Sequence, residues 1–234
     1  MTLFRRVQGV FFNPKDTFRL LSEKPVWVDM LILLLILTTV YAALIASFIP
    51  DDQIALLKSD AEGRARMGEE AYNQRLEFWK DPPSFVAITG IIMQPISLLI
   101  GFLIQSLVIL GMGRLISLEG KYIQIFSALV HANAINLILG NALRAFLIYS
   151  RGSVFQTTTS LAIFFPRLET MSPAYIVLAQ ADFFQLWVFG IFGFALAEIF
   201  QIEWKKALLL SYSFWVIRCL FAIVVALFGM KIGS

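Results

Sequence analysis

The segment from Tyr122 to Tyr149 is long and apolar enough to cross a bilayer, yet residues 131–144 within it carry five polar or charged side chains. A helix in lipid satisfies its own backbone, but polar side chains facing hydrocarbon remain costly. Such side chains therefore face the interior of a bundle. The segment predicts a central membrane helix surrounded by others. The five side chains are His131, Asn133, Asn136, Asn141 and Arg144.

Composition places the whole chain in the membrane class. Of its 234 residues, 59% are hydrophobic and 15% are charged, whereas soluble domains average about 45–50% and about 25%. The net charge of +3 is small and scattered, so we expect no nucleic-acid partner. Its single cysteine excludes an intramolecular disulfide, and the single histidine is far from it in sequence, so we predict no metal site.

The hydrophobic pattern predicts an all-α polytopic membrane protein, one integral membrane domain over residues 1–234. Its predicted architecture is a five-helix transmembrane bundle with an interfacial N-terminal helix and an amphipathic helical loop between spans 1 and 2. The predicted spans are residues 26–49, 85–112, 122–149, 183–200 and 207–228. The predicted segments outside them are 1–25, cytoplasmic or interfacial; 50–84, an outer polar loop; and 150–182, an outer loop with re-entrant or interfacial pieces.

The N-terminal segment has a helix-start signal at Asn13-Pro14, because proline favours the first helical turn. It predicts an interfacial helix or a helix-turn-helix on the membrane surface. A simple basic flank that sets topology is the alternative. Either way, basic side chains are available to lipid phosphates or a partner: Arg5, Arg6, Lys15 and Arg19.

The polar loop 50–84 contains apolar or small residues spaced three and four apart, which predicts one amphipathic helix. This helix could rest on the bundle or project as an interaction arm, with Tyr72 and Trp79 as partner-binding candidates. A solvated loop helix without a partner is the alternative. The early basic residues favour a cytoplasmic N terminus and, with five spans, a C terminus outside.

Two interpretations fit the polar residues of the third span. Asn133, Asn136 and Arg144 share one sector of the helix, which suits either a polar pathway or inter-helix hydrogen bonds. An Arg144–Asp182 pair is predicted at the outer end.

The remaining polar groups are assigned separately. Arg218 lies within the fifth span, and Glu198 is the acid expected to pair with it. His131 is read as a packing or hydrogen-bonding residue. No nucleophile, HExxH or phosphate-loop signature is present, so we predict no catalytic residues, no cofactor and no enzyme.

Three stretches resemble bacterial members of the Yip (Ypt-interacting protein) family: NPKDTFRLLSEKPVW, GKYIQIFSALVHANAI and ADFFQLWVFGIFGFALAEIF. The resemblance covers most of the chain except loop 50–84. It implies five membrane helices, a cytosolic N terminus and a non-enzymatic role. The eukaryotic relatives' long N-terminal region is absent, and a bacterium offers no Rab GTPase partner.

The leading hypothesis is therefore a scaffold or accessory subunit in a bacterial inner membrane. Its partners would be the lipid bilayer and other integral membrane proteins, or a second copy through self-association. The alternative is a channel or a lipid or solute transporter that uses the polar stripe of the third span with Arg218. A membrane-embedded enzyme is a more distant alternative.

Overall fold

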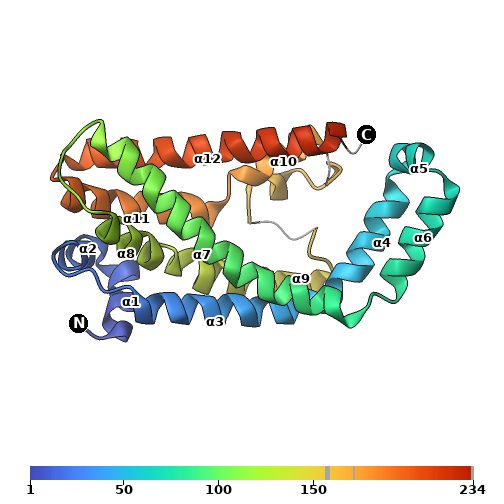
Figure 1. The fold of residues 1–234 in the computed structure, drawn as a ribbon, viewed down its shortest axis with the longest axis horizontal. Coiled ribbons are helices and arrows are strands. Elements are labelled where there is room, and N and C mark those ends of the chain that lie inside the picture. The colour runs from blue at the N-terminus through green and yellow to red at the C-terminus, as the bar shows by residue number, and fades with distance from the viewer. Residues whose placement is uncertain (156–158, 171, 233–234) are drawn as a thin grey trace.

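Among the residues that the structure describes, five helices are long and apolar enough to cross a membrane, and they form an elongated bundle with the N and C termini at opposite ends (Figure 1). The computed structural model describes residues 1–155, 159–170 and 172–232. The predicted all-α membrane bundle is confirmed. The spanning segments are α3 (Val28–Ile45) with its continuation, α7 (Ser84–Arg114), α8 to α9 (Tyr122–Arg151), α11 (Phe183–Phe200) and α12 (Trp204–Ile232).

The third span is the core of the bundle. Of its most apolar 18 residues, 72% are buried, whereas only 22% are buried in the corresponding 18-residue stretches of the spans at α3, α7 and α12. Helix α8 (Tyr122–Ala132) leads through a π-helical turn, η2 (Ile135–Gly140), into α9 (Asn141–Arg151). Every residue from Ile125 to Ile135 is buried. The other helices surround this span and turn Leu, Ile, Val and Phe side chains outward, as lipid contact requires.

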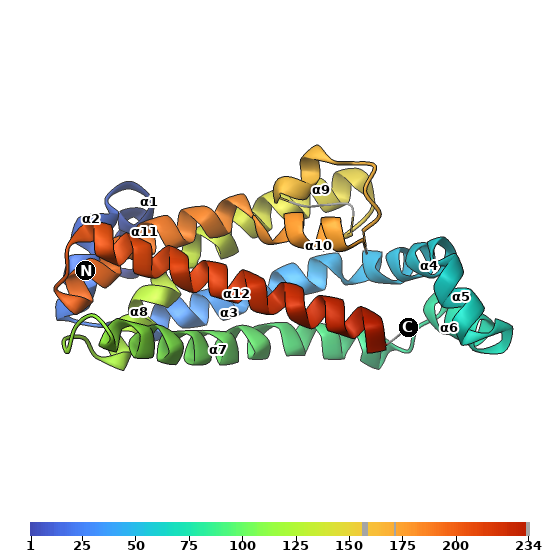
Figure 2. The same ribbon diagram turned by 90° about the horizontal axis from the view of Figure 1, so that it is seen from above.

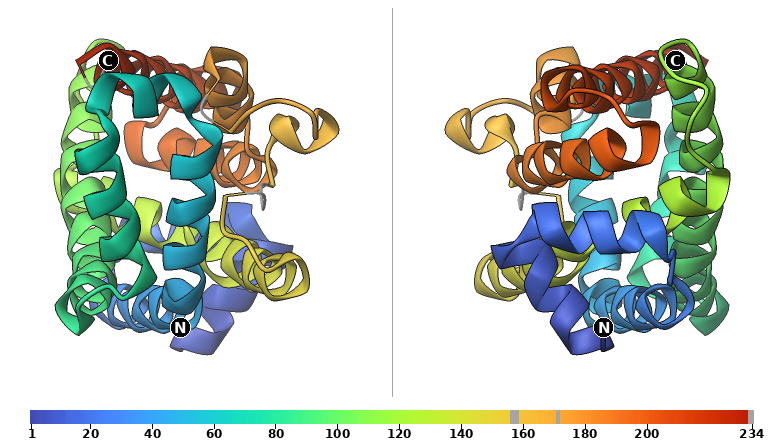
Figure 3. Two further views of the ribbon diagram at one scale, coloured as in Figure 1. Left: turned by 90° about the vertical axis from the view of Figure 1, so that its right-hand side faces the viewer. Right: turned by 90° about the vertical axis from the view of Figure 1, so that its left-hand side faces the viewer.

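Two short helices, α1 (Leu3–Phe12) and α2 (Pro14–Glu23), lie across the N-terminal end of the bundle (Figure 3, right). The predicted helix start at Asn13-Pro14 and the helix-turn-helix form are confirmed. Val10 and Phe18 are buried, and Phe11 packs edge-on against Trp187 at 6.2 Å between ring centroids. The segment is therefore a packed part of the bundle and not a loose flank.

At the opposite end, α3 continues through η1 (Ala46–Phe48) into α4 (Ile49–Ser59). The helical run Val28–Ser59 has 32 residues, about 48 Å of helix against a hydrocarbon core of about 30 Å. Helix α4 therefore extends beyond the membrane. With α5 (Ala61–Met67) and α6 (Glu69–Lys80) it forms a projecting hairpin, which we call the arm (Figures 1 and 2).

Loop 50–84 is helical, as predicted, but it is not one continuous helix. The chain bends at Asp60 and again at Gly68, whose φ of 83° is a left-handed conformation that favours glycine. Three helices result, and α6 folds back on α4 instead of continuing its stripe. The rest of the polypeptide between α9 and α11 contains η3 (Leu161–Phe164) and α10 (Pro173–Gln180). Helix α10 begins at Pro173, and the Ser172 side chain caps it by accepting from the Tyr175 amide.

Close packing between α7 and α11 rests on a glycine. A Cβ atom built on Gly113 would lie 2.0 Å from the Phe200 ring, whereas one on Gly111 meets nothing within 4 Å. Gly113→Ala is therefore expected to destabilise the bundle by about 1–3 kcal/mol through overpacking. Gly111→Ala, in the same helix, is the control and gains helix propensity only. Thermal unfolding in detergent measures both; equal midpoints would contradict the predicted contact.

Candidate functional site

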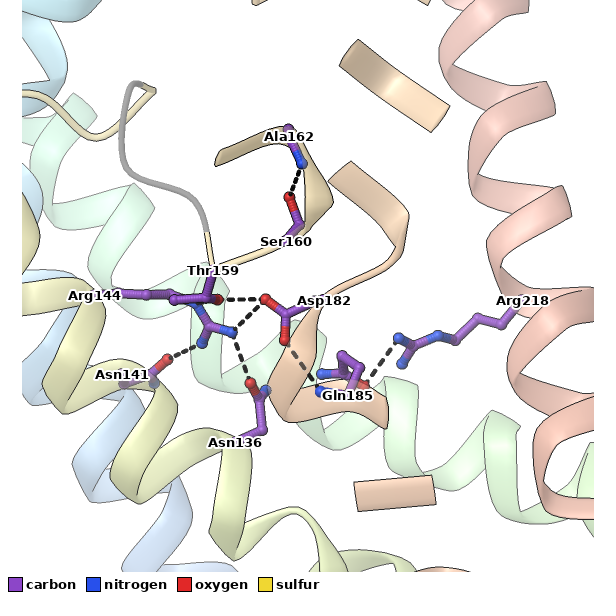
Figure 4. A network of polar contacts seen from close by, with 9 residues as sticks. All are labelled: Asn136, Asn141, Arg144, Thr159, Ser160, Ala162, Asp182, Gln185 and Arg218. Atoms are coloured by element: carbon purple, nitrogen blue, oxygen red, sulfur yellow. Dashed lines mark hydrogen bonds and ion pairs between the residues drawn. The ribbon is translucent and has the colours of Figure 1, made fainter. Parts of the chain in front are cut away.

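Two of the polar groups of the third span, Asn136 and Asn141, converge on Arg144 in α9 (Figure 4). Its guanidinium donates to Asn141 Oδ1 at 3.0 Å, Asn136 Oδ1 at 2.9 Å and Thr159 Oγ1 at 3.2 Å. Its Nη2 also lies 3.0 Å from Asp182 Oδ2. The Arg144 and Asp182 side chains are only 18% and 15% exposed. The predicted Arg144–Asp182 ion pair is confirmed.

Asp182 links this cluster to the fourth span. One carboxylate oxygen takes the Arg144 ion pair and a hydrogen bond from Thr159. The other accepts the Gln185 backbone N–H at 3.0 Å and so caps α11. A capping residue followed three positions later by Gln is a known helix-start signature. That pattern, Asp182-x-x-Gln185, could have pointed to Gln185 from sequence, whereas Thr159 gave no signal.

Two of the predicted asparagines join the cluster. Asn136 lies in the π-helical turn and Asn141 lies three residues before Arg144 in α9, and both accept from the Arg144 guanidinium. Asn133 lies about 16 Å from Arg144 along the helix axis, which is out of reach, and it donates to Leu129 O within its own helix. His131, fully buried, bonds Ser127 O through Nδ1 at 2.8 Å.

The predicted Arg218–Glu198 contact is wrong. Arg218 donates instead to Gln185 Oε1 at 3.0 Å, and its guanidinium lies 5.4 Å from the Phe189 ring centroid. Helices α11 and α12 are antiparallel, with Gly193 packed on Leu208 and Gly190 on Tyr212. Continuing this register brings Arg218 level with the start of α11. Glu198 lies near the other end, in a surface depression beside Lys15 and Trp204.

Arg6, predicted as a ligand for lipid phosphates, is buried instead. It forms an ion pair with Asp29 at the start of α3, and its Nη1 donates to Met1 O at 2.8 Å. The Arg6 side chain is 5% exposed and that of Asp29 is 44% exposed. This contact fastens α1 to the first span. Arg5, Lys15 and Arg19 remain exposed at the same end.

The base of the arm is fixed to the bundle by Asp52, a residue that sequence reasoning did not single out. Asp52 is 7% exposed; it accepts a hydrogen bond from Ser153 Oγ at 2.6 Å and the backbone N–H groups of Val154 and Phe155. Tyr149 adds a hydrogen bond to Leu44 O at 3.2 Å. The direction of α4 is thus set by contacts with the end of the third span.

The tip of the arm is braced by Arg64. Its guanidinium donates to both carboxylate oxygens of Glu69 at 2.9 Å and lies 4.5 Å from the Tyr72 ring centroid. The hydrogen bond from Arg64 lowers the pKa of Glu69. Tyr72 is buried in this contact, so its role as an exposed partner-binding residue is not supported. Trp79 is half-buried beside Phe78, which is 41% exposed.

The Arg144 cluster connects the third span with Thr159 and with the start of α11. The Arg144 guanidinium contacts four side chains from three parts of the chain, and Arg218 lies one residue away through Gln185 (Figure 4). In residues 1–155, 159–170 and 172–232, no three His, Cys, Asp or Glu side chains are grouped to hold a metal ion.

Comparison with known protein families matches residues 9–226 to the Yip1 domain. Comparisons with curated proteins and with solved structures find no match. The matched region extends from α1 to α12 and includes the arm, the Arg144 cluster and all five spans. The chain therefore belongs to the Yip1 domain family.

Proposed function

We propose that this protein is a non-enzymatic membrane scaffold or accessory subunit whose arm binds another integral membrane protein. The single observation that carries the proposal is the arm itself, a helical hairpin that extends beyond the bundle and is fixed at its base by Asp52 (Figure 2). A charged projection that is fixed in this way presents a preformed surface, so the protein loses little conformational entropy when a partner binds.

The charge of the arm indicates the kind of partner. Residues 50–84 hold five basic and eight acidic side chains, and Asp52 and the Arg64–Glu69 pair are used internally. Exposed acidic residues such as Glu70 remain on α6. We therefore expect the partner to present a basic surface just outside the membrane, because complementary charges guide association.

The proposed orientation places the N terminus in the cytoplasm of a bacterial inner membrane and the arm outside. Exposed basic residues gather at the N-terminal end of the bundle, which the positive-inside tendency assigns to the cytoplasm. They are Arg5, Lys15, Arg19, Lys24, Arg114, Lys121, Lys205 and Lys206.

The test replaces residues 56–80 with a six-residue Gly/Ser linker, which spans about 20 Å and bridges two adjacent antiparallel helices. Wild type and variant are purified in a mild detergent and compared by quantitative mass spectrometry. A membrane protein should co-purify in near-equimolar amount with wild type and fall about tenfold with the linker variant. Undiminished co-purification would contradict the proposal.

A charge-reversal variant tests the electrostatic part of the proposal. Glu70→Lys reverses an exposed charge on α6 and should reduce recovery of the partner, more strongly at low ionic strength because exposed charges are screened by salt. Gln74→Ala, an exposed neutral change on the same helix, is the control. Equal recovery with both variants would remove the charge-based part of the proposal.

A further inference from the structure

A surface depression of about 410 Å³ lies where α2, the end of α11 and the start of α12 meet. Small-molecule sites of proteins have volumes of about 300–1,000 Å³, so the depression can hold a ligand. Its lining includes one base, one acid, one amide and two aromatic rings. They are Lys15 from α2, Phe194 and Glu198 from α11, Gln201 from the turn that follows, and Trp204 from α12.

The depression lies at the depth of the lipid headgroups. Helix α11 has 18 residues, about 27 Å of helix at 1.5 Å per residue, which is close to the hydrocarbon thickness of about 30 Å. Glu198 lies two residues before its end at Phe200, and Trp204 begins the next span. Trp204 is 44% exposed, and an exposed tryptophan is typical of the membrane interface. The molecules that this depression meets first are therefore phospholipid headgroups.

The two charges of the depression are not neutralised within the protein. Among the residues that the structure describes, neither the Lys15 ammonium nor the Glu198 carboxylate forms an ion pair or a hydrogen bond. Next to Lys15, by contrast, Asp16 and Arg19 do pair, at 3.1 Å. Because α2 packs on α11, the two unpaired charges are presented to one depression from different helices. A ligand that carries both charges would complement them.

The acidic side of the depression selects a primary ammonium group. Gln201 Nε2 donates to the Glu198 backbone carbonyl, and Gln201 Oε1 remains as a second acceptor besides the carboxylate. Gln201 has a φ of 52°, a conformation in which glycine is the usual residue, so the chain keeps this amide at a cost in backbone strain. A primary ammonium carries three N–H donors and can bond both acceptors, whereas a trimethylammonium carries none.

The basic side of the depression suits a phosphate, because a lysine ammonium is a compact charge that binds phosphate well. The rings of Phe194 and Trp204, with centroids 5.7 Å apart, offer an apolar border to the glycerol and the first acyl carbons. An anionic lipid fits less well, since it would leave the Glu198 charge unpaired. We propose that the depression binds the headgroup of phosphatidylethanolamine, with the ammonium on Glu198 and Gln201 and the phosphate on Lys15.

The experiment places single copies of the full chain in phosphatidylcholine nanodiscs that contain a minor fraction of dioleoylphosphatidylethanolamine, and native mass spectrometry counts the retained lipid. Wild type should retain one phosphatidylethanolamine in preference to phosphatidylcholine. Glu198→Gln removes the charge at nearly constant shape and should weaken retention about tenfold, as loss of a charge-assisted hydrogen bond does. Glu203→Gln, at an exposed acid that does not line the depression, is the matched control and should retain the lipid.

Lys15→Gln is the second variant and should lower retention similarly, with Lys24→Gln at the end of the same helix as its control. One parallel arm replaces phosphatidylethanolamine with phosphatidylglycerol, and another adds soluble phosphoethanolamine; neither ligand should be retained. The proposal is overturned if wild type retains phosphatidylcholine equally, or if either ligand of the parallel arms binds as well. It is also overturned if Glu198→Gln and Glu203→Gln retain phosphatidylethanolamine equally. None of these outcomes depends on the arm.

Discussion

Asp182→Ala is expected to lower the free energy of unfolding by about 3–5 kcal/mol, the usual cost of leaving a buried charge unpaired. The Arg144 guanidinium would not be hydrated once Asp182 is removed, because its side chain is 18% exposed and donates hydrogen bonds to Asn136, Asn141 and Thr159. The same substitution removes the cap of α11, worth about 1 kcal/mol. A neutral inter-helix hydrogen bond in a membrane averages about 0.6 kcal/mol, so the ionic loss dominates.

The measurement is equilibrium unfolding in mixed detergent micelles. Asp182→Asn separates the two effects, because asparagine caps a helix well but carries no charge; it should recover about 1 kcal/mol. Arg144→Met combined with Asp182→Asn should cost less than the sum of the single changes, since no buried charge is then left unpaired. Asp81→Ala, at an exposed position, is the neutral control. A wild-type midpoint for Asp182→Ala would contradict the buried pair.

The sequence predicts the bundle well because membrane helices are specified by length and hydropathy, which are local properties. The Arg144–Asp182 pair was also predictable, since the two residues are the polar groups at the same end of adjacent spans. Residue spacing at 100° per residue placed Asn133 on the same face as Arg144 but ignored their separation of about 16 Å along the helix axis, and Asn133 bonds Leu129 O within its own helix instead. The spacing also cannot detect the π-helical turn at Ile135–Gly140.

The wrong predictions for Arg218 and Arg6 have a different cause. Arg218 was matched to the acid in the neighbouring span, but the antiparallel register of α11 and α12 is set by glycine packing and selects Gln185. Arg6 looked solvent-accessible because basic residues near a membrane usually are. Its burial depends on α1 folding back over the bundle, which brings it to Asp29, 23 positions away. Both contacts are tertiary and are not encoded in local pattern.

The Arg6–Asp29 pair leads to an asymmetric prediction. Asp29→Ala should cost about 3–5 kcal/mol, because Arg6 is 5% exposed and would be left as a buried charge. Arg6→Met should cost about 1 kcal/mol or less. Asp29 is 44% exposed and can be hydrated once its partner is gone, so that loss resembles the loss of a surface pair. The partner with the more exposed side chain is therefore the more sensitive position.

Unfolding in mixed micelles measures the two costs, and limited trypsin digestion locates them. If Arg6 must reach water in Asp29→Ala, α1 and α2 will leave the bundle, and cleavage after Lys15 and Arg19 will accelerate. Arg6→Met should leave both sites protected to nearly the wild-type extent, because Val10 and Phe18 still pack under the bundle. Asp16→Ala removes an exposed ion pair with Arg19 in α2 and serves as the control. Equal destabilisation by Asp29→Ala and Arg6→Met would mean that both charges are hydrated in the folded protein, and the N-terminal helices would then be held by apolar packing alone.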